Sequence, residues 1–329
     1  MLSTPTQSAN APTPAVPRLA VVCPCFEEQE ALPRTIPQLL GVLDGLAAEG
    51  AIARESFLLL VDDGSHDGTW RIIEQAAAAD ARVLGMHQSR NRGQQSSLLA
   101  GLMEARDMAD VVVTCDCDGQ DDFGAIREML ARWREGAEVV YGVRSSRAVD
   151  NAGKRESARL YYRLLAWLGA EVVYDHADFR LCDAAVLDAL AEYGEVNLFL
   201  RGMFPLMGFE SAVVEYERKG RVAGRGHYSL ARMASLALDG VTSTSIRPLR
   251  IIAGFGALVS VLGFAAIVWA IVAALLGHTV SGWASLMCVV SFMGGVQLLS
   301  LGVIGEYVGK TYLEAKRRPR YLIDRRTWK

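Results

Sequence analysis

Several features that would point to other protein classes are missing from this chain of 329 residues. Six cysteines are too few for a disulfide framework in a chain of this length. The formal net charge of -3 argues neither for nor against nucleic acid, and we expect no nucleic-acid partner. Residues 1–17 carry no charged side chain and lack the basic start and apolar core of a signal peptide. We expect them to form a disordered tail, and the domain after them to stay in the cytoplasm.

Charged residues are also absent from two long segments near the C-terminus, residues 251–277 and 280–305. Each is long enough to cross a hydrocarbon core of about 30 Å, which takes a helix of ~20 residues. The alternative is a pair of buried helices in a soluble fold. Only a short turn separates the segments, so they predict a membrane hairpin. The pair Gly305 and Gly309 permits close helix approach and self-association.

Basic residues flank both ends of this hairpin. Arg247 and Arg250 precede it, and five lysines and arginines between residues 310 and 320 follow it. The positive-inside rule therefore places both ends of the hairpin in the cytoplasm. The hairpin therefore predicts a multi-pass membrane protein with the domain before the hairpin and both termini in the cytoplasm.

Apolar β-branched runs alternate with amphipathic segments in the first half of the chain. We expect strands at Leu19–Cys23 (ended by Pro24), Phe57–Val61, Arg82–His87, Val111–Cys115 and Glu138–Gly142. The intervening segments predict helices, and this alternation predicts an α/β fold with a mainly parallel sheet and helices on both faces. Further along, the sequence predicts helices at 160–168 and 183–194, a loop at 197–209 and a last strand at 212–220.

Acidic residues follow three of these strands, where open α/β sheets bind ligands. Asp116 and Asp118 follow the fourth strand, Asp62 and Asp63 the second, and a pair of glutamates the first. Carboxylates crowded at one edge are accommodated if a cation and hydrogen-bond donors occupy the site, and Mg²⁺ or Mn²⁺ prefers such oxygens. The alternative is a solvated acidic turn. We expect a metal–diphosphate site here, with Asp62 and Asp63 binding base and ribose.

Arginines after the fifth strand suit the remaining phosphate charge, because guanidinium groups match phosphate oxygens. Arg144 and Arg155 are the candidates, although a surface charge is the commoner role for an arginine. A nucleotide, a metal and a membrane hairpin together favour transfer of a sugar from a nucleotide diphosphate to a lipid phosphate. Six basic residues are candidates for holding the lipid phosphate, or else contact anionic head groups. They are Arg201, Arg221, Arg225, His227, Arg247 and Arg250.

Many stretches, in order, resemble one family. They are VVCPCFEEQE, LLVDDGSHDGT, RNRGQQSSLLAGL, CDCDGQDD, VVYGVRSSR, ADFRL, FLRG, GRGHYS, DGVTSTSIRPLR and IGEYVGKTYLEAKRRPRYLI. The chain resembles the bacterial polyprenyl-phosphate glycosyltransferases of the GT-A type, family 2, akin to dolichyl-phosphate mannose synthase and the bactoprenol glucosyltransferases. The resemblance implies a GT-A domain and inverting transfer from a nucleotide-sugar donor, by preference a UDP-sugar, to undecaprenyl or another polyprenyl phosphate. It also implies a bacterial inner-membrane location, with the catalytic domain on the cytoplasmic side.

The resemblance also implies roles for individual residues. Asp116, Asp118 and Gln120 match the cation and diphosphate motif, and Asp178, with Arg180 beside it, matches the acid near the sugar and the acceptor. The remaining residues implied for the nucleotide-sugar site are Pro24, Glu28, Asp62, Asp63, Gly64, Ser65, Arg90, Gly93, Arg144 and Arg155.

The sequence departs from the family pattern at several positions. Glu27 stands where the family usually has Asn, Gly119 where it has Leu, Asp122 where it has Pro, and His227 replaces a lysine of the acceptor site. These departures keep open a non-catalytic membrane scaffold that retains the fold. A processive polysaccharide synthase is a further alternative, although its Gln-x-x-Arg-Trp motif is absent.

Two Cys-x-Cys pairs lie at the ends of the first and fourth strands, Cys23 with Cys25 and Cys115 with Cys117. If these strands are neighbours the four thiols meet, and they act either as buried hydrophobes, the favoured role, or as a zinc site. The expected organisation is a tail (1–17), a GT-A domain (18–228), an amphipathic interface segment (229–250), the membrane hairpin (251–305) and a basic cytoplasmic tail (306–329).

Overall fold

The computed structural model describes residues 16–144, 176–196, 199–217, 245–276 and 282–328. These residues belong to two compact units. The sheet unit contains the described residues from 16 to 217 and from Pro319 onward, and the hairpin unit contains those from 245 to Arg318. The predicted helix at 160–168 and the basic segment before residue 245 lie outside the described residues.

The sheet unit is built on an eight-stranded sheet with the order β7-β5-β6-β4-β1-β2-β3-β8. Its strands are β1 (Leu19–Cys25), β2 (Phe57–Asp62), β3 (Val83–Gln88), β4 (Val111–Thr114), β5 (Val139–Arg144), β6 (His176–Asp183), β7 (Ser211–Tyr216) and β8 (Ile323–Arg326). The central strands β4, β1, β2 and β3 are parallel, as are β5 and β7, whereas β6 and β8 pair antiparallel with their neighbours. The prediction of a mainly parallel sheet is confirmed.

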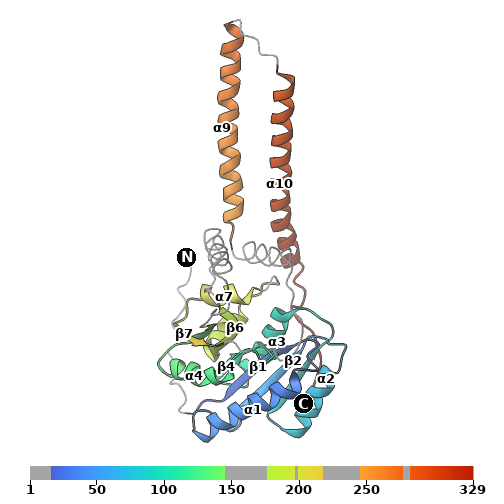
Figure 1. Ribbon diagram of the computed structural model, residues 1–329, viewed down its shortest axis with the longest axis vertical. Coiled ribbons are helices and arrows are strands. Elements are labelled where there is room, and N and C mark those ends of the chain that lie inside the picture. Colours follow the sequence, from blue (N-terminus) through green and yellow to red (C-terminus); the bar gives the residue numbers. More distant parts are fainter. Residues whose placement is uncertain (1–15, 145–175, 197–198, 218–244, 277–281, 329) are drawn as a thin grey trace. The chain divides into compact units, whose positions relative to one another are not determined.

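Helices cover both faces of this sheet (Figure 1). They are α1 (Leu32–Ala48), α2 (Thr69–Ala79), α3 (Gln94–Arg106), the 3-10 turn η1 (Phe123–Ala125), α4 (Ile126–Arg134), α6 (Ala184–Ala191) and α7 (Leu200–Leu206). Alternate residues of each central strand face opposite sides. Leu58 and Leu60 pack in one cluster with α1, α2 and α4, while Leu59 and Val61 pack in the other with α3, α6 and α7. These strands are therefore buried on both faces, which explains their unbroken apolar runs.

Three local predictions were wrong. Pro24 does not end β1, which continues to Cys25. Strand β1 is paired with β4 only as far as Val22. Beyond that point no N–H of β1 is needed for a hydrogen bond to β4, so Pro24, which lacks an N–H, is tolerated in the strand. The expected loop at 197–209 contains the short helix α7, and the strand at 212–220 is not the last, because β8 follows the hairpin.

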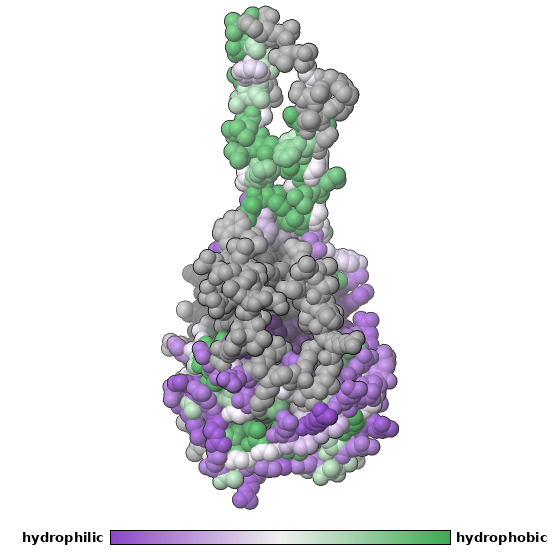
Figure 2. Space-filling view, viewed as in Figure 1, coloured by the Kyte–Doolittle hydropathy of each residue, from purple (hydrophilic) through white to green (hydrophobic). Residues whose placement is uncertain are grey.

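The hairpin unit consists of the helices α9 (Arg247–Leu275) and α10 (Trp283–Ala315). Among the described residues, Arg247–Ala273 and Phe292–Ala315 are long and apolar enough to span a membrane, with mean hydropathies of 2.5 and 1.2. Large apolar side chains on both are exposed, including Leu275 at 82% and Leu298 at 71%. The space-filling view shows apolar residues gathered over these helices (Figure 2). The exposure speaks against buried helices of a soluble fold and indicates association with a membrane.

Candidate functional site

The predicted site residues of the sheet unit gather at the carboxyl ends of its central strands. Strand β1 has β2 on one side and β4 on the other. Asp62 is the last residue of β2, and Asp116 lies just beyond the end of β4. The sheet therefore brings these two acidic positions to the same edge, as expected for parallel strands.

Asp63 holds the loop that follows β3. Its carboxylate accepts hydrogen bonds from the backbone N–H groups of Arg92 and Gly93, both at 2.8 Å, and from the Gln88 side chain at 2.9 Å. Burial raises the pKa of Asp63, and these donors oppose that shift. Gly64 makes the approach of this loop possible, because a Cβ at its φ of +68° would lie 2.5 Å from the backbone of Arg90.

Asp62 faces the turn before α2. Its Oδ1 accepts hydrogen bonds from the backbone N–H of Ser65 at 3.1 Å and from the Ser65 hydroxyl at 2.5 Å. The Ser65 hydroxyl in turn accepts from the backbone N–H of Glu27, which links this turn to the end of β1. The Glu28 N–H similarly donates to the Thr69 hydroxyl at 2.9 Å. Burial raises the pKa of the Asp62 carboxyl, and its buried Oδ2 has no hydrogen-bond partner among the described residues.

A crowded acidic cluster lies at the end of β4. Burial and the neighbouring charges of Asp121, Asp178 and Asp118 raise the pKa of Asp116 to about 7. The Gln94 amide bridges two of these acids, donating to Asp116 Oδ1 at 2.9 Å and to Asp178 Oδ2 at 3.2 Å. The two carboxylates are thus drawn together from different strands.

The loop after β4 is held by hydrogen bonds between its own residues and by one to β7. The backbone N–H of Gln120 donates to Asp118 Oδ1 at 3.1 Å, and the Asp116 N–H donates to Asp121 Oδ2 at 3.2 Å. The hydroxyl of Tyr216 donates to Asp121 Oδ1 at 2.7 Å. Burial raises the pKa of Asp121, and the charge of Arg144 opposes the shift. Asp121 therefore positions the loop that carries Asp116 and Asp118.

Asp178 is the most heavily bonded acid of the site. It is buried in β6, and its Oδ1 accepts from Arg180 at 2.9 Å and from Arg201 Nε at 3.0 Å. Arg201 also donates to Oδ2 at 2.9 Å, so its guanidinium holds both carboxylate oxygens. Arg180 is itself only 1% exposed and lies over the Phe204 ring. Arg180 therefore binds Asp178 from the buried side, whereas Arg201 binds it from a side that is partly exposed to solvent.

The acidic cluster has the right chemistry for Mg²⁺ or Mn²⁺. No three carboxylate, imidazole or thiol groups among the described residues form a complete metal site. Asp116 and Asp118 nevertheless offer hard oxygens, and burial together with the neighbouring carboxylates raises the pKa of Asp116, an effect that a bound cation would oppose. Magnesium is commonly held by one or two carboxylates together with substrate phosphates. The donor set therefore fits a cation that arrives with a diphosphate.

The described part of the sheet unit does not include several predicted site residues. Arg155, Arg221, Arg225 and His227 lie outside the described residues, and Arg247 begins α9 in the hairpin unit. Pro24 lies within β1. Arg144 ends β5 and interacts with Tyr216, Asp121 and Asp116, within the expected diphosphate region.

The four cysteines of the paired motifs meet, as expected for neighbouring strands. Cys23 and Cys115 have their sulfur atoms 3.2 Å apart, and all four thiols are buried and free. Burial and contact with Cys25 raise the pKa of Cys117, so its thiol form is favoured. These contacts are those of small buried side chains that pack against one another.

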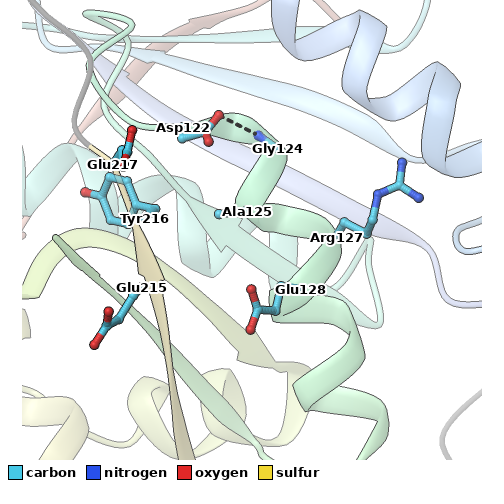
Figure 3. Close-up of a pocket in the computed structure, with 8 residues that line it drawn as sticks. All are labelled: Asp122, Gly124, Ala125, Arg127, Glu128, Glu215, Tyr216 and Glu217. Atoms are coloured by element: carbon cyan, nitrogen blue, oxygen red, sulfur yellow. Dashed lines mark hydrogen bonds between the residues drawn. The ribbon is translucent and has the colours of Figure 1, made fainter. Parts of the chain in front are cut away.

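A pocket of about 470 Å³ lies beside the acidic loop, between α4 and β7 (Figure 3). Four carboxylates line it against a single arginine, Arg127, so its charge would repel a diphosphate. The pocket shares Tyr216 with the loop that Asp121 holds, but neither Asp116 nor Asp178 lines it. It is therefore distinct from the candidate active site.

Sequence reasoning missed Gln94, Asp121 and Tyr216. Asp121 was visible within the acidic run after β4, but its spacing gave no sign that it holds the loop. Gln94 opens α3 and bridges two acids that are far apart in sequence. Tyr216 carries no local signal, because its role depends on the pairing of β7 with β5.

Comparison with known proteins agrees with this geometry. Residues 20–190 match the family described as "Glycosyl transferase family 2", and residues 247–311 match "GtrB C-terminal hairpin". The uncharacterized glycosyltransferase YkoT of Bacillus subtilis (strain 168) is 46% identical over 94% of this chain and 91% of that protein. The prophage bactoprenol glucosyl transferase homolog of Escherichia coli (strain K12) is 34% identical over 94% of this chain and 99% of that protein.

A viral relative has the same full-length likeness. The bactoprenol glucosyl transferase of Shigella phage SfX is 35% identical over 94% of this chain and 99% of that protein. The match to both the sheet unit and the hairpin is therefore collinear along the chain. This protein belongs to glycosyl transferase family 2, as a glycosyltransferase with a GT-A fold and a C-terminal hairpin of the GtrB type.

Proposed function

We propose that this glycosyltransferase moves a sugar from a nucleotide-diphosphate donor, by preference a UDP-sugar, to undecaprenyl or another polyprenyl phosphate. The observation that carries the proposal is the junction of Asp116 and Asp178 through Gln94. Through Gln94, the proposed metal ligand Asp116 and the buried Asp178, which is bound by two arginines, belong to one cluster. The same chain also has a hairpin of two helices that are long and apolar enough to span a membrane. The names of the bactoprenol relatives support the choice of lipid acceptor.

In this proposal the residues of the sheet unit divide the work. Asp62, Asp63 and the turn around Gly64 and Ser65 bind the nucleoside. Asp116 and Asp118, with Gln120, would hold Mg²⁺ or Mn²⁺, which stabilises the charge of a departing diphosphate. Arg144 shares that phosphate charge.

Asp178 lies where sugar and acceptor would meet. Arg180 and Arg201 both donate hydrogen bonds to its side chain, which suits a role in orientation and not as a strong base. A strong base is not required, because a lipid phosphate is already anionic. We assign Asp178 to orientation and to charge stabilisation at the sugar. Arg201, on the exposed side of Asp178, is suitably placed to bind the acceptor phosphate.

The proposed topology has the GT-A domain on the cytoplasmic face and the hairpin crossing the inner membrane twice. We keep the domain division at residues 18–228, 229–250 and 251–305, although helix α10 continues to Ala315. A membrane-impermeant thiol reagent should label a Thr279→Cys variant only from outside. Labelling from the cytoplasm alone would overturn this topology.

The function is tested with purified full-length protein, undecaprenyl phosphate, Mg²⁺ or Mn²⁺, and a panel of UDP- and GDP-sugars. The proposal expects one donor to release its nucleoside diphosphate, and only when lipid is present. A folded protein that binds none of these donors in the presence of metal would instead favour the non-catalytic scaffold.

A further inference from the structure

The strand that follows the hairpin lies against the donor side of the sheet. β8 pairs antiparallel with β3, and His87 stands opposite Arg325 in the register. Thr327 fixes this register through two bonds to Gly85, one from the Gly85 N–H to its hydroxyl at 2.9 Å and one from its own N–H at 3.0 Å. The position of β8 along β3 is therefore well defined.

This register places His87 between two carboxylates. Its Nδ1 lies 2.6 Å from Asp324 Oδ1, and its Nε2 lies 3.7 Å from Asp62 Oδ2. In the part of the chain that the structure describes, this buried Asp62 oxygen has no hydrogen-bond partner, while the other oxygen of the same carboxylate is held by Ser65. The His87 ring therefore lies beside the Asp62 oxygen that Ser65 does not hold, within ion-pair distance but beyond hydrogen-bond distance.

The His87 ring is fixed on its remaining sides. Trp70 packs against it edge-on, with ring centroids 5.3 Å apart. The Arg325 guanidinium lies over Trp70 and within 3.2 and 3.0 Å of the two ring nitrogens. The charged groups that face His87 are therefore Asp62, Asp324 and Arg325. An imidazole bonded to Asp324 in this enclosure has little freedom to turn away from Asp62.

The same C-terminal segment also supports the loop that Asp63 holds. The Ser89 N–H donates to the Leu322 carbonyl at 3.0 Å, and Arg92 donates to the Pro319 carbonyl at 3.1 Å. The Arg92 N–H is one of the donors to Asp63. Residues 319–324 are thus linked to both acids, to Asp62 through His87 and to Asp63 through the loop after β3.

We propose that Asp324 of β8 and His87 of β3 belong to the donor site, as positioning residues for the Asp62 carboxylate. The inference rests on the proposed nucleoside-binding role of Asp62. In this arrangement Asp324 fixes the His87 ring, and His87 fixes the orientation of the acid that binds the nucleoside. The chain that leaves the hairpin therefore completes the donor site instead of ending as a free basic tail.

The test is the affinity for UDP in the presence of MnCl₂, measured by calorimetry on the full-length protein in detergent. His87→Phe keeps the ring packing on Trp70 but removes both nitrogens, and Asp324→Asn removes the charge that fixes them. Each is expected to weaken UDP binding about tenfold, because a misaligned Asp62 would lose about one hydrogen bond to the nucleoside. His87→Gln, which restores a donor near the Nε2 position, should recover part of the affinity.

Arg326→Gln is the matched control, because it breaks a contact of the same strand with Glu104 and faces away from His87. It should leave UDP affinity unchanged. The double variant His87→Phe with Asp324→Asn should bind no more weakly than His87→Phe alone, since both act through one contact. Melting temperatures of the same samples show whether a variant has lost binding or folding. If His87→Phe melts early, the UDP affinity of His87→Gln tests the inference in its place.

Normal UDP affinity in folded His87→Phe and Asp324→Asn would overturn the inference. An equal loss in Arg326→Gln, or additive losses in the double variant, would also overturn it by showing a general structural role for β8. If the unmodified protein binds neither UDP nor GDP, the proposed function fails first and this inference falls with it.

Discussion

The buried pair of Arg180 and Asp178 allows a quantitative test of how the site is held together. Both side chains are only 1% exposed, and they are joined at 2.9 Å. Replacing Arg180 by Met keeps an unbranched apolar side chain next to the Phe204 ring. It removes one of the cations that bind the Asp178 carboxylate. Breaking a buried ion pair by removing one partner typically costs about 3–5 kcal/mol.

The structure places this variant at the lower end of that range. Arg201 remains on Asp178 through two bonds of 3.0 and 2.9 Å, so the carboxylate keeps one guanidinium. We therefore expect Arg180→Met to lower the free energy of unfolding by about 3 kcal/mol. For a domain of this size that corresponds to a fall of roughly 6–12 °C in melting temperature, measured by scanning fluorimetry on the full chain.

Two further variants show whether the loss comes from the buried charge. Arg132→Gln removes an exposed arginine that pairs with Glu135 on α4, and it should cost less than about 1 kcal/mol. In an Asp178→Asn background, Arg180→Met should cost clearly less than it does alone, because no buried charge is left uncompensated. A melting temperature within about 3 °C of the unmodified protein for Arg180→Met would refute the reasoning.

The other predictions concern packing, metal and turnover. Gly101→Ala should lower the free energy of unfolding by about 1–3 kcal/mol, because the added Cβ would lie 2.4 Å from the Val22 side chain. An unchanged melting temperature would contradict this and would show that α3 moves away to make room. Gly41→Ala, at a helix position with nothing within 4 Å, should instead stabilise by up to about 1 kcal/mol in the same melts. Asp116→Ala should abolish metal-dependent donor binding in calorimetry, and unchanged affinity would remove the metal assignment. Asp178→Asn should lower kcat by about 100-fold or more with a smaller effect on donor affinity, whereas equal losses in steady-state kinetics would indicate a binding role alone.

The central architecture was predictable because its signals are local. Strands β1, β2 and β4 are buried on both faces, so they read as continuous apolar runs followed by acids. The long uncharged helices of the hairpin are equally plain in the sequence. Their ends were harder to place, since α10 continues ten residues beyond Gly305 as an amphipathic helix before Arg317 leaves the helical region with a φ of 45°.

The missed elements have weak or misleading local signals. β8 reads IDRR, and charged residues on an edge strand hide it from any apolar pattern. α7 is short and contains Pro205, so a loop was the natural expectation. The link between His87 and Asp324 spans 237 residues and exists only because β8 returns to the sheet.

One departure from the family pattern has a physical reading in the structure. Glu27 adopts a φ of 55°, in the left-handed region that Asn tolerates better than Glu. The Asn usual at this position in the family would thus relieve backbone strain, and Glu27 keeps the turn through its N–H bond to Ser65.

The most direct test of the central claim is transfer of a radiolabelled sugar into the lipid phase by the purified full chain. The reaction would contain the donor identified by the panel, undecaprenyl phosphate and Mn²⁺, with Asp178→Asn in parallel. The account predicts label in the lipid only when donor, acceptor and cation are all present, and a strongly reduced rate in the variant. Folded, nucleotide-binding protein that never transfers label to the lipid would contradict it.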